Sequence, residues 1–164
     1  QFASMVENGV SLARALFAFN SVNVEGWALY AEAEMQPYLP LDGQLIALQF
    51  RLLRAARAFL DPGLQQGVMS LDEARRVLTR EVVLTDANAE QELERYTFRS
   101  PGQATSYFYG YQRLLELRAR TEITLGASFN RQRFHDFVLA QGVLPPELLA
   151  RAVQDEFVPA ELKR

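Results

Sequence analysis

Hydrophobic residues recur along the chain at spacings of three and four, which is the period of an amphipathic α-helix. The first such face contains Met5, Val6, Gly9, Leu12, Ala13, Leu16 and Phe17. This pattern predicts one helix over residues 2–19, followed by a loop at Asn20–Asn23. No segment is convincing as a strand, because the apolar run Val82–Leu84 is too short.

Proline, glycine and capping residues divide the rest of the chain into further helices. These are expected over residues 24–36, 42–60, 70–83, 85–96, 100–126, 130–141 and 145–157. The pattern predicts an all-α fold, a multi-helix array in which residues 1–164 form one domain without an internal linker or repeat.

Specific residues mark the expected ends. Asp42 and Asn130 are plausible caps, and Gly126 is a plausible terminating glycine. Ser70 and Glu73 match a capping box, and Ser100 and Gln103 repeat that pattern. The breaks are assigned to Pro37, to Asp61–Gly63 and to Pro159.

Composition narrows the possible chemistry. The chain has 164 residues, of which 49 % are apolar and 23 % charged, a globular composition long enough to bury a core. A net charge of −3 without a basic run gives no electrostatic footprint for nucleic acid. No apolar stretch reaches the roughly 18–20 residues that span a membrane. The absence of cysteine excludes disulfides and thiolate sites, and one histidine, His135, cannot build a multi-histidine metal site.

Glu25 and Glu32 are the first candidate functional residues. They lie seven positions apart, so they share one face of the expected helix. Gly26 leaves space beside Glu25. The plainer interpretation is an acidic first turn favoured by the helix dipole, with Trp27 in the core.

Gln103, Tyr107 and Gly110 form the second candidate group, because they fall on one helix face. A tyrosine hydroxyl can stabilise a developing oxyanion. The alternative is that Tyr107 and its aromatic neighbours only pack between helices. His135 beside Asp136 has no second histidine to work with, and is more simply a packed or surface residue.

Several motifs occur in an order that resembles a known family. They are Glu25–Glu32, Arg54–Arg57, Asp61–Leu64, Pro101–Tyr107, Leu117–Arg118, Leu125–Gly126, Phe134–Asp136 and Gly142–Pro145. Together they resemble the C-terminal half of the catalytic domain in the bacterial domain-of-unknown-function 885 family. That family is similar to the all-helical, neurolysin-like zinc metallopeptidases around angiotensin-converting enzyme and thimet oligopeptidase.

The resemblance implies a Zn²⁺ cofactor and a peptide substrate. An HExxH helix would supply two histidine ligands and the water-activating glutamate, and is expected upstream of residue 1. Glu25 matches the third zinc ligand, Tyr107 the oxyanion-stabilising tyrosine, and Gln103 would line the same pocket. The chain alone is expected to be inactive and not to hold zinc by itself.

Two positions depart from the family pattern. Gln65 replaces a usual histidine, and Val68–Ser70 stand where a tryptophan is usual. A catalytic role for that histidine would mean altered or weak activity, whereas a structural role would make Gln65 harmless. A non-catalytic helical binding module, or a decayed peptidase, is therefore the competing hypothesis.

The start of the sequence also carries an expectation. The chain begins at Gln1 and enters a helical pattern at once, which favours a piece of a longer protein. Such a piece should expose an apolar face on the 2–19 helix or on the Glu25 helix. The missing N-terminal part, or a second copy in a homodimer, would cover that face. The resembling family includes exported and lipoprotein members. Any localisation signal is expected in the missing N-terminal part, so the sequence leaves the compartment open.

Overall fold

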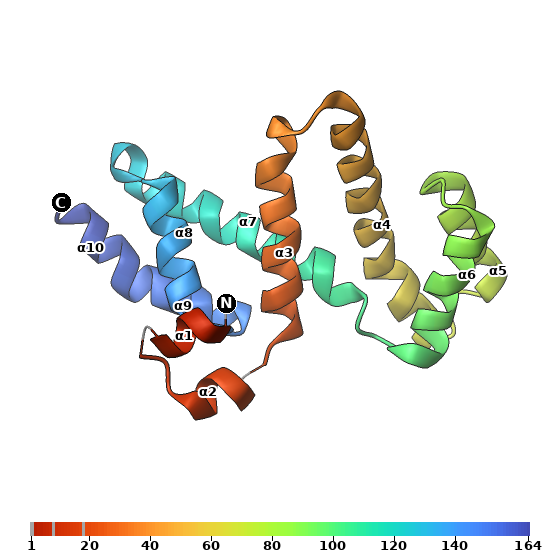
Figure 1. Ribbon diagram of the computed structural model, residues 1–164, viewed down its shortest axis with the longest axis horizontal. Helices are drawn as coiled ribbons and strands as arrows, with labels where there is room; N and C mark the ends of the chain where they lie inside the picture. The colour runs from red at the N-terminus through yellow and green to blue at the C-terminus, as the bar shows by residue number, and fades with distance from the viewer. Residues whose placement is uncertain (1, 8, 18) are drawn as a thin grey trace. The chain divides into compact units, whose positions relative to one another are not determined.

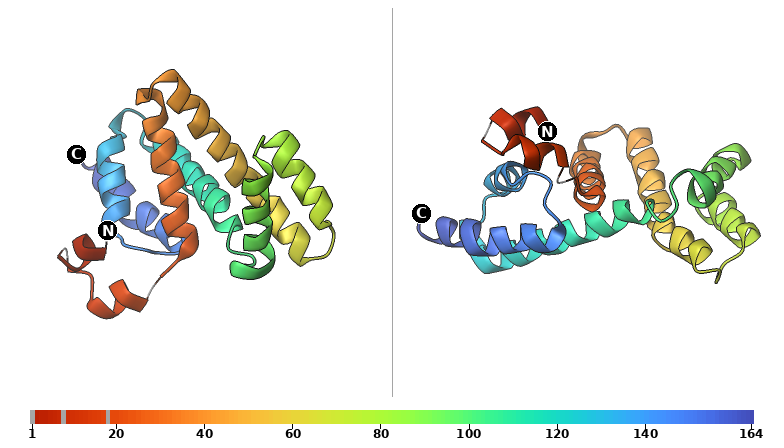
Figure 2. Two further views of the ribbon diagram at one scale, coloured as in Figure 1. Left: turned by 45° about the vertical axis from the view of Figure 1, so that its right-hand side comes forward. Right: turned by 90° about the horizontal axis from the view of Figure 1, so that it is seen from below.

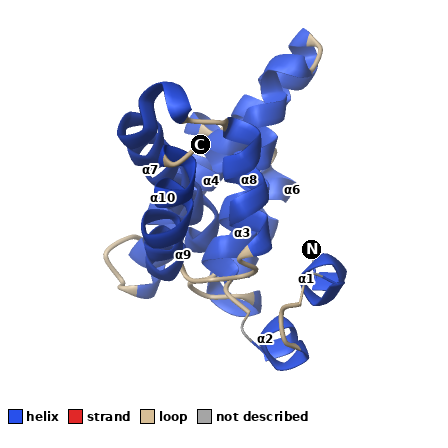
Figure 3. Ribbon diagram, turned by 90° about the vertical axis from the view of Figure 1, so that its left-hand side faces the viewer, coloured by secondary structure: helices blue, strands red, loops and turns tan. Residues whose placement is uncertain are grey.

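The computed structural model describes residues 2–7, 9–17 and 19–164, and the regular elements in that part are all helical. Figure 3 shows helices joined by loops, without a strand in the described part. The predicted all-α class is confirmed. The α-helices are α1 (Phe2–Glu7), α2 (Leu12–Phe17), α3 (Ser21–Met35), α4 (Leu41–Gln65), α5 (Leu71–Arg76), α6 (Asp86–Glu94), α7 (Thr105–Leu125), α8 (Arg131–Ala140), α9 (Pro146–Ala152) and α10 (Val158–Leu162).

Shorter helical turns lie between some of these helices. Turns of 3₁₀ type occur at Gln36–Tyr38 and Gly126–Ser128. π-Helical turns follow α5, α6 and α9, at Val77–Glu81, Arg95–Arg99 and Val153–Phe157.

The prediction of one helix over residues 2–19 is wrong, because that segment contains the two short helices α1 and α2. Gly9 lies between them with a φ of +87°, a left-handed conformation that ends a helix. Residues 1, 8 and 18 lie outside the described residues. The loop predicted at Asn20–Asn23 is also wrong, because α3 begins at Ser21. The Asn20 side chain accepts the Asn23 N–H at 2.9 Å, as a helix cap does.

Two predicted helix ends are wrong, because the helical segments continue through Pro62 and through Pro159. Helix α4 continues through Pro62 to Gln65, and the flanking Asp61 and Gly63 are both buried. Their packing outweighs the low helix propensity of proline. Pro159 lies in the first turn of α10, which continues from the π-helical turn Val153–Phe157 without a break.

The capping predictions had mixed outcomes. Ser70 and Glu73 form both hydrogen bonds of a capping box, and Asn130 caps α8. Gly126 follows α7 with a φ of +51°. Pro40 rather than Asp42 is the N-cap of α4. The second capping box is wrong, because α7 begins only at Thr105 and the Gln103 N–H donates to the Ser100 carbonyl as a turn.

The chain groups into two compact units, and we describe each by itself. The terminal unit contains residues 1–24 and 112–164, and the central unit contains residues 25–111. Helices α3 and α7 contribute residues to both.

In the terminal unit, the second part of α7 runs beside α9 and α10 (Figure 2). The Phe134 and Phe157 rings meet edge to face with centroids 5.9 Å apart. Arg133 pairs with the buried carboxylate of Glu161 at 2.5 Å. The Asn23 side chain donates to the Leu144 carbonyl at 2.7 Å.

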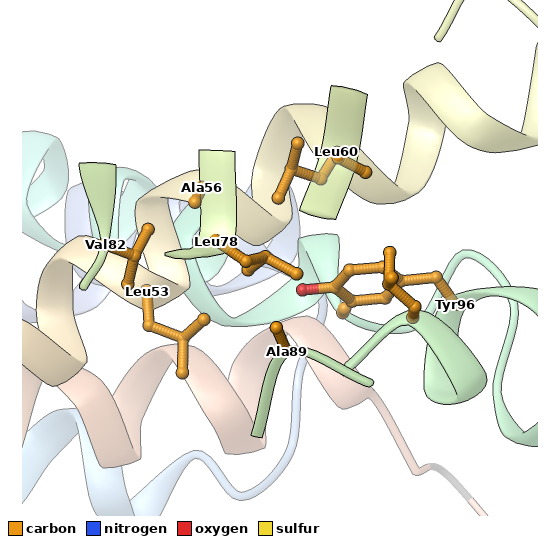
Figure 4. Packing of buried hydrophobic residues seen from close by; sticks show 10 residues of the cluster. Leu53, Ala56, Leu60, Leu78, Val82, Ala89 and Tyr96 are labelled. Atoms are coloured by element: carbon orange, nitrogen blue, oxygen red, sulfur yellow. The ribbon is translucent and has the colours of Figure 1, made fainter. Parts of the chain in front are cut away.

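In the central unit, α3 and α4 run antiparallel, joined by the 3₁₀ turn at Gln36–Tyr38 (Figure 1). Helix α5 and the π-helical turns Val77–Glu81 and Arg95–Arg99 pack against α4, and α6 packs against α5 (Figure 2). The core between them is apolar and is seen closely in Figure 4. Its buried members are Leu53, Ala56, Leu60, Ala74, Leu78, Val82, Ala89, Leu93, Tyr96 and Ala104.

Helices α3 and α7 touch at a pair of glycines in the central unit. A Cβ atom placed on Gly26 would lie 2.5 Å from the carbonyl carbon of Gly110, with no flexible side chain between them to move. Gly26 therefore does not open space beside Glu25, as the sequence suggested. Instead, the two glycines allow the two backbones to come into direct contact.

Among the exposed apolar side chains, two groups stand close together in the sequence. Leu12, Leu16, Phe17 and Phe19 are exposed, as expected for the N-terminal segment. A longer row lies on α4, where Leu41, Leu45, Leu48, Leu52 and Phe59 are 47–84 % exposed at spacings typical of one helix face. We call these five residues the α4 stripe. None of the described helices is both long and apolar enough to cross a membrane.

The glycine contact predicts a specific cost for a single methyl group. Gly26→Ala is expected to destabilise the chain by about 2 kcal/mol or more, because overpacking against backbone forces the helices apart. Gly43→Ala in the first turns of α4 is the control, since its Cβ would meet only side-chain atoms at 3.3 Å or more. Urea unfolding followed by circular dichroism measures both, and equal midpoints for the two variants would contradict the contact.

Candidate functional site

The central unit brings together the three residues that the sequence singled out. Glu25 lies on α3, Gln103 in the turn before α7, and Tyr107 in the first turn of α7. The Gln103 amide Nε2 faces the Glu25 carboxylate, with 3.4 Å between Nε2 and Oε1. All three side chains are partly exposed, so solvent or a ligand can reach them. This juxtaposition depends on the glycine contact one residue after Glu25.

Arg95 links the other two members. Its Nη2 donates to Gln103 Oε1 at 2.6 Å and to the Tyr107 hydroxyl oxygen at 3.2 Å. Because Arg95 requires an acceptor, the Gln103 carbonyl faces Arg95 and its NH₂ faces Glu25. Because the Tyr107 oxygen accepts from Arg95, its proton points elsewhere. Tyr107 can therefore donate a hydrogen bond to a ligand.

A buried ion pair lies next to the ring of Tyr107. Arg57 on α4 binds Glu92 on α6 through two nitrogens, at 2.7 and 2.5 Å. The Tyr96 hydroxyl donates to the same carboxylate at 2.7 Å. The guanidinium carbons of Arg57 and Arg95 lie 5.1 and 5.4 Å from the centre of the Tyr107 ring, within cation–π range. These contacts fix the ring while leaving its hydroxyl accessible.

Burial and the partner's charge shift the pKa values of Arg57 and Glu92 in opposite directions. Burial by itself raises the pKa of Glu92, but the hydrogen bonds and charge of Arg57, with the Tyr96 hydroxyl, outweigh burial and lower that pKa. Burial likewise lowers the pKa of Arg57, yet the Glu92 carboxylate holds it above its ordinary value. Burial, together with the Glu92 charge, raises the pKa of Tyr96. Both members of the pair stay charged at neutral pH.

Asp61 determines the shape of the turn that carries Gln103. Its fully buried carboxylate accepts the Gly102 N–H at 2.8 Å and the Ala104 N–H at 3.0 Å. Gly102 has a φ of +78°, a conformation that glycine adopts without strain. With both flanking amides held, Gln103 points out of the turn.

Gln65 has a structural contact in this chain. Its Nε2 donates to the Tyr96 carbonyl at 2.7 Å and lies 3.4 Å from Asp61 Oδ1. The side chain therefore links α4 to Tyr96 in the π-helical turn Arg95–Arg99. Met69, in the segment that lacks the family's tryptophan, packs against Gly63 at the edge of the core.

The other sequence candidates lie away from this cluster. Glu32 pairs with Arg54 at 3.2 Å, so the two carboxylates on this helix face have different partners. His135 is a residue of α8 in the terminal unit, with its ring 6.0 Å from that of Phe134.

The donor set of this chain does not complete a metal site. Within the described ranges, no three His, Cys, Asp or Glu side chains come close enough together to hold a metal ion. Zinc sites take at least three protein ligands, and Glu25 would supply one carboxylate. Histidine ligands from elsewhere would be required.

Sequence reasoning missed Arg95 and Glu92. Arg95 is eight residues before Gln103 and lies in a different helical element, so no helix-face spacing connects them. Glu92 is 35 residues from Arg57. The Arg54–Arg57 motif could have pointed to carboxylate partners elsewhere in the chain. The structure identifies those partners as Glu32 for Arg54 and Glu92 for Arg57.

The Glu92 pair predicts a pH dependence of stability. A carboxyl group whose folded pKa is lower than its unfolded value, about 4.3, stabilises the fold above that pH. That contribution is lost as pH falls through the folded pKa. At pH 7, Glu92→Gln is expected to cost about 3–5 kcal/mol by leaving Arg57 buried without its partner.

Urea unfolding at pH 7 and at pH 3 tests this expectation. The gap in unfolding free energy between wild type and Glu92→Gln should shrink on acidification. Glu90→Gln, in an exposed pair with Arg75, is the control and should stay within about 1 kcal/mol of wild type at both values. A gap that is constant with pH would contradict the assignment.

Comparison with known proteins places the chain among bacterial proteins. The family model described as "Bacterial protein of unknown function (DUF885)" matches residues 1–153. None of the curated proteins matches the chain.

Two solved structures are similar to the whole of the chain. One is a candidate lipoprotein of unknown function from Shewanella oneidensis, with 26 % identity and a TM-score of 0.83 over 93 % of this chain. The other is a candidate lipoprotein from Colwellia psychrerythraea, with 29 % identity and a TM-score of 0.87 over 98 % of this chain. The chain spans 28 % of the length of each. By the family match over nearly its full length, the chain belongs to the DUF885 family of bacterial proteins of unknown function.

Proposed function

We propose that this chain is the C-terminal part of the catalytic domain of a zinc-dependent peptidase. The observation that carries the proposal is the Glu25–Gln103–Arg95–Tyr107 cluster, in which a carboxylate and a donor hydroxyl lie on one connected polar network. In the complete gene product, an HExxH helix would supply the imidazole ligands that this chain lacks. Bound zinc would activate water and polarise the peptide carbonyl.

Each residue of the chain has a distinct part in this proposal. Glu25 would be the carboxylate ligand, oriented by the Gln103 amide. Tyr107 would donate its proton in a hydrogen bond to the carbonyl oxygen as negative charge develops there. Arg95 would be a positioning residue, because it fixes the Gln103 amide and the Tyr107 hydroxyl through one nitrogen.

Peptide hydrolysis by the complete gene product tests the proposal. Tyr107→Phe is expected to lower kcat by about 10²- to 10³-fold with little change in KM, as for loss of one oxyanion donor. Tyr109→Phe, on the same helix but exposed, should be unaffected. No cleavage of any short peptide by the zinc-loaded wild type would favour the alternative, a non-catalytic helical binding module or a decayed peptidase.

We also propose that the rest of the gene product covers the α4 stripe, with a second copy of the chain as the alternative. The similar structures are more than three times as long as this chain, and exposed leucines on one helix face favour a packed partner.

The test compares one substitution in two contexts. In the isolated chain, Leu45→Asp is expected to change the unfolding free energy by less than about 0.5 kcal/mol, because Leu45 is exposed there. In the complete gene product the same change should cost more than about 2 kcal/mol. Val68→Asp, exposed outside the stripe, is the control. Neutral behaviour in both contexts would contradict coverage, and a dimer of the isolated chain in sedimentation would favour the second copy.

A further inference from the structure

A polar cleft lies beside the Arg95 side chain. It has a volume of about 310 Å³ and is lined by Gln91, Glu92, Arg95, Arg99 and Ser100. These residues come from the end of α6 and the π-helical turn that follows it. π-Helical turns occur frequently at functional sites. The cleft lies on the central unit, which also contains the Gln103 and Tyr107 side chains.

The charges around this cleft do not cancel. Two arginines at or beside the cleft, Arg57 and Arg99, each pair with a carboxylate. Arg57 takes both oxygens of Glu92, and Arg99 pairs with Glu94 at 2.9 Å. The hydrogen bonds of Arg95 go to the neutral Gln103 and Tyr107, and both use the Nη2 atom. Within the described residues Arg95 forms no ion pair of its own, and its charge reaches Glu92 only at longer range, where it helps to lower the pKa of that carboxyl.

We propose that this cleft binds the C-terminal carboxylate of a peptide, with Arg95 as the anion-binding group. A guanidinium is suited to a carboxylate because it offers parallel N–H donors, and the hydrogen bonds of Arg95 to the described residues leave its Nε and Nη1 unused. The inference rests on the proposed peptidase function for the identity of its ligand.

The geometry also limits where the peptide would be cut. Arg95 touches the Tyr107 hydroxyl, and an extended peptide advances about 3.3–3.6 Å per residue. A carboxylate held by Arg95 therefore leaves room for only one or two residues before the carbonyl that faces Tyr107. The enzyme would be an exopeptidase that removes residues from the C-terminal end.

A matched pair of peptides tests this specificity in the zinc-loaded complete gene product. One has a free C-terminal carboxylate, and the other ends in an amide. We expect wild type to cleave the acid with a kcat/KM about 10- to 100-fold higher, which is the range for one charged hydrogen bond. Arg95→Gln should bring the ratio close to one, and Arg95→Lys, which keeps the charge, should retain part of the preference.

The ratio of kcat/KM for the acid to kcat/KM for the amide distinguishes binding of the carboxylate by Arg95 from positioning of Tyr107 alone. If Arg95 only positions its neighbours, Arg95→Gln lowers the rates for both peptides by the same factor, and that result would overturn the inference. Arg75→Gln is the control, because Arg75 pairs with Glu90 and does not line the cleft, and it should keep the preference. Equal rates for acid and amide in wild type would also overturn it.

A binding measurement separates this inference from the proposed function. N-acetyl-alanyl-alanine and its amide are titrated by calorimetry into wild type and Arg95→Gln. Tighter binding of the acid by at least tenfold, lost in the variant, would support the cleft even if no peptide is cleaved. Equal affinity for the two probes in wild type would overturn the cleft, whether or not the protein proves to be a peptidase.

Discussion

The contact between Gly26 and Gly110 is the constraint on which the candidate site depends. Any side chain at Gly26 would enter the backbone of α7, so the two helices can approach this closely only with glycine there. Glu25 precedes one glycine, and Tyr107 lies one helical turn before the other. The closeness of the backbones therefore brings a carboxylate on α3 within reach of the polar side chains around the start of α7.

Three side chains of the second half of α4 bind the segments that carry the candidate site. Arg57, Asp61 and Gln65 are spaced four residues apart, so they share one face of the helix. Arg57 holds Glu92, Asp61 holds the amides on both sides of Gln103, and Gln65 holds the Tyr96 carbonyl. The motifs around positions 54–64 are thus explained by what they hold in place, because their side chains act through the residues of the site.

The sequence predicted the helical class and several caps because those depend on local spacing. Ser70, Asn130 and Gly126 were assigned correctly for this reason. The errors arose where distant contacts outweighed local preference. Pro62 stays inside α4 because its neighbours are buried, and residues 100–103 form a turn in which Asp61, far away in the sequence, accepts the amides of Gly102 and Ala104.

The candidate site shows the same difference between features that depend on local sequence and features that depend on distant contacts. Glu25, Gln103 and Tyr107 could be chosen from residue type and family resemblance, and the structure brings them together. Arg95 could not, since its partners are eight and twelve residues away in another element. Likewise, Glu32 pairs with Arg54, a partner that only the packing of α3 beside α4 brings close.

The proposed function depends most on Glu25 being a metal ligand that this network holds in place. The most direct test is the zinc content of the complete gene product, measured by elemental analysis for wild type, Glu25→Gln and Glu32→Gln. The account predicts roughly one zinc per chain in wild type and in Glu32→Gln, with zinc lost or much weakened in Glu25→Gln. A zinc content that is indifferent to Glu25, or no zinc in the wild type, would contradict it.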